Sequence, residues 1–227
     1  EIYALVYTQY GNRLGQISVV GDLLPQIPQV KEWTVFAPEM EIPLFSEKGD
    51  RIIVSPMSVK PDFFTFFGLN FVAGNPETAL KSQNAVVISR KLADALYPGE
   101  DPIGRSVGLE QMDLRSGTTF IIADSAPPTV VNNYIIAGII DGLGKNVLPE
   151  TDIYMNYSEV KGVGGNYMFR TDSGKNVNDI LQTIKNHPVT EEYFKSYLEN
   201  TEIIEFESIK DGEIIAPGFR NISDPKT

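Results

Sequence analysis

The chain contains no cysteine among its 227 residues. This absence excludes disulfides, thiolate metal ligands and cysteine nucleophiles. His187 is the single histidine, so a histidine-rich zinc site is excluded, and we interpret this side chain as structural or surface-exposed. No apolar run approaches the roughly 20 residues that a transmembrane helix needs, and no signal peptide is visible.

Basic residues are also scarce. The chain has 19 Lys and Arg against 30 Asp and Glu, which gives a net charge of −11. Nucleic-acid clefts and polybasic lipid-binding patches both need clustered Lys and Arg, so this balance argues against either. Hydrophobic residues make up 42% of the chain, which is enough to form a core. The length suits one large domain or two small ones.

The two ends of the sequence lead us to expect an excised segment. The chain begins at Glu1, directly in a strand-like run, and stops at Thr227 without a helix stop or a tail. We expect targeting and anchoring elements to lie outside the segment. A processed mature protein is the alternative.

The first sixty residues alternate between strand and turn patterns. Residues 47–50, Glu-Lys-Gly-Asp, predict a hairpin turn. We predict a strand over residues 2–9, a short helix over residues 21–28, and further strands over residues 33–37, 42–46 and 51–55.

The segment from Phe63 to Val107 has the densest pattern. Four phenylalanines crowd a short helix over residues 63–67, which Gly68 is expected to end. Ser89 is a good N-cap for a later helix with an apolar stripe at Leu92, Ala93 and Leu96. The segment predicts, in order, a strand over residues 84–88, that helix, a Pro- and Gly-rich turn over residues 97–104 and a strand over residues 106–109.

The remaining residues predict more strands and two helices. The apolar run at residues 134–140 is typical of a central strand buried on both faces. Alternation at residues 152–157 and 167–171 predicts half-buried strands. The tail predicts a β-α-α-β order, with N-caps at Asn176 and Thr190 and a last strand over residues 202–207.

Together these elements predict an α+β fold with two lobes. Both chain ends, residues 1–57 and 158–227, are expected to form the first lobe. The second lobe, residues 58–157, is expected to be an inserted, β-rich subdomain of ordinary size.

Motifs of enzyme chemistry are weak in this sequence. Residues 158–161 match the short S-x-x-K pattern but lack its partner motifs. The glycines of residues 162–165 lack dinucleotide-binding spacing, and no Walker A loop is present. Glu100, Asp101 and Asp141 are candidate Ca²⁺ ligands, but no EF-hand spacing surrounds them, and we interpret them as solvated acidic surface. We assign no catalytic, cofactor or metal residue.

The aromatic cluster of residues 63–67 allows two interpretations. It could form a partner-binding patch, or it could pack the core of the inserted lobe. Aromatic residues at helical spacing are mostly core, so packing is the interpretation we favour. Trp33, on a strand beside Val35, is interpreted in the same way.

Several segments resemble the extracytoplasmic domain of MacB/FtsX-type ABC transporter permeases. The resemblance lies in Val59 to Asn75, in Val86 to Arg105 with its Leu-Tyr-Pro-Gly-Glu-Asp-Pro-Ile-Gly run, in Tyr134 to Asp141 and in Glu1-Ile2-Tyr3. The matches span most of residues 1–157, whereas the tail after residue 170 matches in layout only. Asn75 stands where Arg is commoner in the family, and residues 110–133 look longer and more irregular than usual.

The resemblance implies a porter-like lobe of β-α-β units, formed by both chain ends, and an inserted Sabre-like lobe. It implies membrane helices before Glu1 and after Thr227, and a place in the periplasm as part of an inner-membrane protein. The implied role is non-catalytic, coupling cytoplasmic ATP hydrolysis to cargo export or mechanotransmission. The implied partners are a cytoplasmic ATPase, a second permease protomer, and a periplasmic adaptor or cargo, with no cofactor and no nucleic acid.

For this role, the residues expected to make partner or lobe contacts are Phe63, Phe64, Phe67, Tyr97 and Asp101. A first alternative is a binding module that recruits a cell-wall hydrolase or a lipoprotein. A second, which we favour less, is a carboxylate-based hydrolase. That enzyme would need two acids with raised pKa values facing one cleft.

Overall fold

The computed structural model describes residues 1–9, 12–14, 16, 19–112, 129–141, 151–157, 164–172, 176–188 and 192–206. Its strands are β1 Ile2–Gln9, β2 Asn12–Leu14, β3 Glu32–Pro38, β4 Ile42–Ser46, β5 Arg51–Val54, β6 Pro56–Val59, β7 Phe71–Gly74, β8 Ala85–Ser89, β9 Ser106–Met112, β10 Thr129–Ile140, β11 Ile153–Asn156, β12 Asn166–Arg170 and β13 Thr201–Glu205. Its helices are α1 Val19–Leu23, the 3₁₀ turn η1 Leu24–Gln26, α2 Phe63–Phe67, α3 Arg90–Leu96, α4 Val177–Lys185 and α5 Glu192–Glu199.

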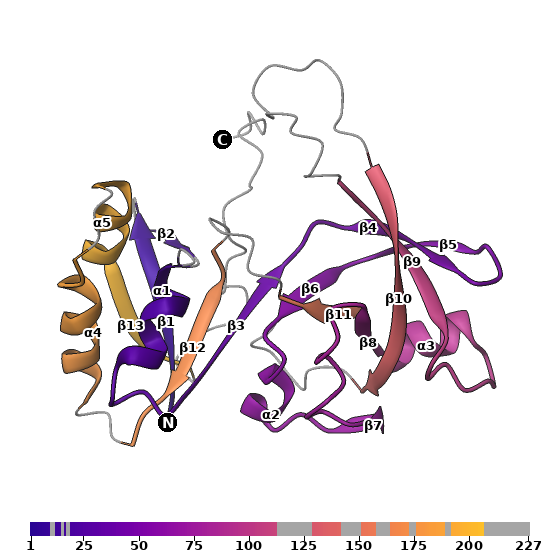
Figure 1. Cartoon of the computed structure of the whole chain (residues 1–227), viewed down its shortest axis with the longest axis horizontal. Helices are drawn as coiled ribbons and strands as arrows, with labels where there is room; N and C mark the ends of the chain where they lie inside the picture. The colour runs from indigo at the N-terminus through magenta and orange to yellow at the C-terminus, as the bar shows by residue number, and fades with distance from the viewer. Residues whose placement is uncertain are drawn as a thin grey trace, which may run out of the picture.

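All of these strands join one mixed sheet (Figure 1). The order is β13-β1-β12-β3-β6-β11-β8-β10-β9-β4-β5, with β2 beside β1 and β7 beside β10. The predicted α+β class is confirmed, and so is the predicted β-α-α-β order of the tail. Among the described residues, no helix is long and apolar enough to cross a membrane.

The sheet has two halves that follow the sequence. The terminal half holds β1, β2, β3, β12 and β13, which come from the two ends of the described chain. The middle half holds β4 to β11, all from residues 42–156. The two halves meet where β3 pairs antiparallel with β6, through Phe36 opposite Val59.

The hairpin of β4 and β5 lies in the middle half. The division of the sequence into lobes places residues 42–54 with the chain ends, but β4 pairs with β9 at the far side of the sheet. This pairing joins residues about 60 positions apart, and no local pattern specifies it. The lobe boundaries at residues 57 and 158 stay a prediction, because a single sheet runs through both halves.

Strand register sorts the side chains onto two faces of the sheet. Phe36 lies opposite Val59, and Tyr154 lies opposite both Met57 and Val87, so these side chains share one face. Their neighbours Val35, Val86 and Met155 point to the other face. Helix α2 packs on the first face, in one cluster with Phe36, Tyr154 and Val87. Helices α1, α3, α4 and α5 contribute to clusters on the second face.

Local chemistry explains where the short helices begin and end. Gly68 ends α2 in the left-handed conformation, at φ 65°, which glycine adopts at little cost. The Ser89 side chain accepts a hydrogen bond from the Leu92 backbone N–H and caps α3, as predicted. Asn176 does precede α4, but its side chain makes no cap, because its amide lies toward Thr171 Oγ1 at 3.4 Å.

Burial departs from the predicted pattern on three strands. β11 and β12 are almost wholly buried rather than half-buried, since hydrophobic clusters cover both of their faces. Residues 134–140 of β10 are expected to be buried on both faces; Ile136 and residues 138–140 are buried, but Ile135 is 46% exposed. Helix α3 packs on β10 from the opposite face, where Ile136 is buried.

Candidate functional site

Helix α2 lies at the junction of the two halves of the sheet. We call the cluster around it the shared core, because among the described residues it alone of the three hydrophobic clusters has buried members from both halves. The terminal half contributes Ala4, Phe36 and Met168, and the middle half contributes α2 with Met57, Val59, Ala79, Leu80, Val87, Ile140 and Tyr154. The buried members of the other two clusters come from one half each. The shared core therefore packs the two halves of the sheet against each other.

Aromatic rings make most of the contacts of the shared core. The Phe63 ring lies 5.8 Å from Phe36 and 6.2 Å from Tyr154, and so touches both halves. The Phe64 ring meets Tyr154 at 5.4 Å and Phe71 at 4.9 Å, both edge-on. Edge-on pairs at these separations are favourable beyond the area that they bury.

Polar contacts tie the N-terminal end of α2 to β3. The Asp62 carboxylate, just before α2, accepts a hydrogen bond from Thr34 Oγ1 at 3.1 Å and pairs with Lys60. The Lys60 ammonium also donates to the Trp33 carbonyl at 3.2 Å and lies 4.4 Å from the centre of the Trp33 ring. Trp33 is half-buried, so its indole works as a platform for this cation as well as packing against the terminal half.

A second cation holds the other end of the helix. Arg170, on β12, donates from Nη2 to the Phe66 carbonyl oxygen at 2.7 Å. Its guanidinium lies 5.1 Å from the Phe66 ring centre, and Nε lies 3.4 Å from a Glu32 carboxylate oxygen. A cation at the last carbonyls of a helix is electrostatically favourable. Together, Asp62 and Arg170 fix both ends of α2 to the terminal half, although α2 belongs to the middle segment.

The Tyr154 hydroxyl is an exception within the shared core. Its oxygen is buried and has no hydrogen-bond partner in the described part of the chain. Burial and the nearby Asp152 raise the pKa of this phenol, so it stays neutral. A buried hydroxyl without a partner costs free energy.

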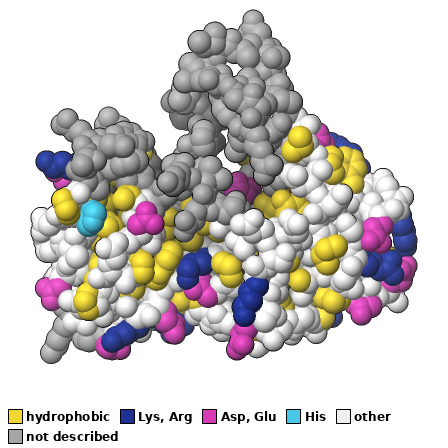
Figure 2. Space-filling model, viewed as in Figure 1, with side chains coloured by type: hydrophobic (Ala, Val, Ile, Leu, Met, Phe, Trp, Pro, Cys, Tyr) yellow, Lys and Arg dark blue, Asp and Glu magenta, His cyan; other side chains and the backbone are white. Residues whose placement is uncertain are grey.

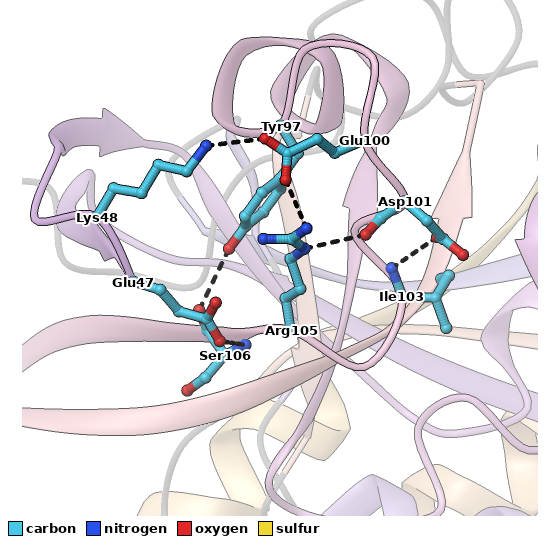
Figure 3. A network of polar contacts seen from close by, with 8 residues as sticks. All are labelled: Glu47, Lys48, Tyr97, Glu100, Asp101, Ile103, Arg105 and Ser106. Carbon is cyan, nitrogen blue, oxygen red and sulfur yellow. Dashed lines mark hydrogen bonds and ion pairs between the residues drawn. The ribbon is translucent and has the colours of Figure 1, made fainter.

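A polar network surrounds the Pro98–Gly104 loop at the far side of the middle half (Figure 3). Glu100 bridges Lys48, at 2.9 Å, and Arg105, at 2.5 Å. The Arg105 guanidinium stacks 4.9 Å from the Tyr97 ring centre, and the Tyr97 hydroxyl donates to the Ser106 carbonyl at 3.3 Å. The Lys48 hydrogen bond, reinforced by both cations, lowers the pKa of Glu100. These contacts join the β4–β5 hairpin to the loop after α3.

The residues predicted to make contacts fall into two places. Phe63 and Phe64 are fully buried and Phe67 is half-buried, all in α2. Tyr97 is buried just before the loop, and Asp101 is exposed within it, where Asp101 Oδ1 accepts a hydrogen bond from the Ile103 backbone N–H at 3.0 Å. Core packing is thus confirmed for Phe63 and Phe64. The sequence interpretation missed that this core is shared with the terminal half, and it missed Phe36, Arg170 and Phe206.

The weaker motifs gain no support as catalytic sites. The S-x-x-K residues 158–161, Thr190 and Gly162 lie outside the described residues. Asp141 pairs with Arg90, whose hydrogen bond lowers the pKa of that carboxyl. Within the described ranges, no group of three or more metal-binding side chains occurs. On the face drawn in Figure 2, cationic and anionic side chains lie interspersed rather than in one basic area.

His187 lies at the end of α4, where its backbone N–H donates to the Ile184 carbonyl at 3.2 Å. It borders an open hollow of about 520 Å³ between α4 and α5, lined by Gln182, Lys185, Asn186, His187, Pro188, Lys195 and Glu199. Glu199 is the carboxylate of this lining, and it lies 3.8 Å from the Lys195 ammonium. One ion-paired acid does not supply the two-acid arrangement of a hydrolase.

Comparison with known families identifies the class of the domain. The sequence matches the family model of the MacB-like periplasmic core domain over residues 4–187. The chain therefore belongs to the MacB-like periplasmic core domain family, and the resemblance found in its motifs is confirmed. No curated protein gives a significant match.

Solved structures show the same fold. A domain of a protein assigned as a permease from Porphyromonas gingivalis is 17% identical, with a TM-score of 0.62, and the match covers 89% of this chain and 88% of that one. The periplasmic region of MacB from Actinobacillus actinomycetemcomitans is 13% identical, with a TM-score of 0.58 and coverages of 91% and 89%. The extracellular domain of the noncanonic ABC-type transporter YknZ from Gram-positive bacteria is also 13% identical, with a TM-score of 0.58 and coverages of 90% and 100%.

Proposed function

We propose that this chain is the non-catalytic extracytoplasmic domain of an ABC transporter permease. In this role it couples ATP hydrolysis in the cytoplasm to cargo export or to mechanotransmission. The family match over residues 4–187 carries the proposal. Its partners would be a cytoplasmic ATPase, reached through the permease membrane helices, a second permease protomer, and a periplasmic adaptor or cargo.

The shared core supports a mechanical role for α2. Porter-like and Sabre-like lobes that rearrange during a transport cycle need a contact that both lobes share, and such transitions act through packed interfaces. Phe63, Phe64 and Phe67 are the lobe-contact residues in this proposal, since their helix is packed into the shared core. Tyr97 and Asp101 would shape a rigid rim at the far side of the middle half.

The proposal is tested in the intact protein. The full gene should encode a hydrophobic helix on each side of this segment, and a protease added outside the cytoplasmic membrane should cleave within it. Replacing the domain by a short linker should abolish export or signalling while the ATPase still hydrolyses ATP. A gene without flanking hydrophobic helices would refute the proposal.

A partner-recruiting module is the second candidate, and one observation favours it. On the face of the sheet that carries α2, three apolar side chains of β5 and β10 stay exposed: Ile53 at 48%, Val131 at 53% and Ile135 at 46%. Photoreactive residues at these positions should cross-link to a second protein, whereas one at the exposed Lys91 of α3, on the opposite face, should not. Equal labelling from both faces would remove this candidate.

A further inference from the structure

The first and last described strands meet beside α2. Strand β1 pairs antiparallel with β13, and Tyr3 lies opposite Glu205. Ile2 and Phe206 therefore lie at the same end of this pair. Both side chains, with Ile204, pack against the shared core. The two points at which the described chain begins and ends thus share a neighbour, which is the aromatic cluster of α2.

An unbroken series of ring contacts leads from the last described residue into the middle half. The Phe206 ring lies 5.3 Å from Phe67, and Phe67 lies 5.1 Å from Phe63. Phe63 in turn lies 6.2 Å from Tyr154, on the middle strand β11. Packed side chains of this kind carry displacement between elements, because a close-packed interior resists compression.

Arg170 makes the matching connection from the first strand. In the pairing of β1 with β12, Arg170 lies directly opposite Ile2. Its side chain reaches across to the Phe66 carbonyl oxygen at 2.7 Å. The first strand is therefore joined to the last turn of α2 through one arginine, and the last strand is joined to it through one phenylalanine.

The rings of this series differ in burial, and the outer rings are the ones that can separate. Phe63 is fully buried, whereas Phe67 and Phe206 are both partly exposed. Phe67 and Phe206 are already partly exposed, so separating them exposes less new surface than separating the fully buried Phe63 and Tyr154, which would open the core. A displacement of the chain ends would be transmitted while the outer contacts hold, and lost when they part.

We propose that the Phe67–Phe206 contact and the Arg170–Phe66 carbonyl hydrogen bond form a coupling latch between the ends of the domain and α2. Through this latch the position of β1 and β13 sets the position of the middle half. The inference rests on the proposed function, since it assumes that ATP-driven movement reaches the domain through its ends. It adds to that function the particular residues that receive the movement.

The absence of cysteine allows a direct test by spin labelling. Cysteines replace the exposed Glu202 on β13 and Lys91 on α3, in the intact permease with its ATPase and with other reactive cysteines removed. The distance between the two spin labels is then measured in the nucleotide-free and in the ATP-bound protein. In the wild-type background this distance should shift on ATP binding, because the two halves move relative to each other. Phe206→Ala and Arg170→Gln should lose the shift while ATP hydrolysis continues, and Phe206→Tyr should retain it.

The exposed Val72→Ala change on β7, which lies outside the series, serves as the control and should leave the shift intact. Thermal unfolding confirms that each variant is folded. A shift that persists in both Phe206→Ala and Arg170→Gln overturns the latch but leaves the proposed function standing. A shift that Val72→Ala also removes overturns the latch as a specific device. No shift in the wild-type background contradicts movement between the halves, and with it the proposed function.

Discussion

Two features of the Phe63–Val107 segment use opposite chemistry. Helix α2 is aromatic, buried and joined to both halves of the sheet. The Pro98–Gly104 loop is largely exposed, and its charged Glu100 pairs with Lys48 and Arg105, so these contacts stay within the middle half. The loop carries the most specific resemblance to the family, yet α2 makes the long-range connection. A distinctive motif therefore need not mark the residues that join the halves.

Removing one ring of the shared core should give the largest loss of stability. Phe63→Ala deletes a fully buried side chain with partners in both halves, and such deletions cost about 3–5 kcal/mol. Urea unfolding of the chain measures the loss. Asp101→Ala in the loop, which removes one exposed hydrogen bond, should cost far less. Equal losses would erase the contrast between the two features.

Glycine substitutions should next separate the loop from a closely packed strand, β7, which follows α2 in the same segment. Gly74, at φ 86°, has no room for a side chain, because an added Cβ would lie 2.4 Å from the Ala137 carbonyl oxygen. Gly104, at φ 82° in the loop, has open space around it. Both Gly→Ala changes incur backbone strain, but Gly74→Ala should cost about 1–3 kcal/mol more, as overpacking does. Similar unfolding free energies for the two variants would contradict this packing.

Removing either of two tyrosine hydroxyls should change the stability of the fold in opposite directions. Tyr154→Phe removes a buried hydroxyl that has no partner among the described residues, so stability should hold or rise by up to about 1 kcal/mol. Tyr97→Phe removes the hydrogen bond to the Ser106 carbonyl, so stability should fall by about 0.5–1.5 kcal/mol. Denaturation midpoints at neutral pH measure both. A loss above about 1 kcal/mol for Tyr154→Phe would show that its hydroxyl has a partner.

The smallest effect on stability is expected when acid protonates Glu100 in the loop. Lys48 lowers the pKa of Glu100 in the folded state. The Glu100 carboxylate therefore stabilises the fold fully at a pH above the ordinary carboxyl pKa of about 4.3. This stabilisation is lost as the pH falls through the lowered pKa of the folded state. The difference in melting temperature between wild type and Glu100→Gln should therefore shrink on acidification. It should also shrink at high salt, because the group is exposed. A difference that is constant with pH would exclude this ion pair as its source.

Local patterns predicted the pieces of both features but not the connections between them. The Gly68 stop and the Ser89 cap depend on residues within one turn, and both are confirmed. Arg170 reaches the Phe66 carbonyl across 104 positions, and β4 reaches β9 across some 60. Such contacts depend on the register of distant strands, which sequence alternation constrains only to one of two faces.

Aromatic spacing predicted burial of α2 without predicting what covers it. The pattern places Phe63 and Phe64 on the apolar side of a helix, and that side is compatible with any apolar surface. Phe36, on the other half, follows Val35 on a strand whose two faces are both apolar, and nothing local says which face α2 covers. For the same reason, the core was assigned to the inserted lobe alone.

Hydrogen exchange tests most directly whether α2 joins the two halves. Phe63→Ala should lower the protection of backbone amides in β3 and β12 and in β8 and β11 together, because its ring packs on both halves. Leu92→Ala, in the cluster confined to the middle half, should lower protection mainly in β8, β10 and α3. Protection lost in only one half after Phe63→Ala, or the same pattern from both variants, would contradict the shared core.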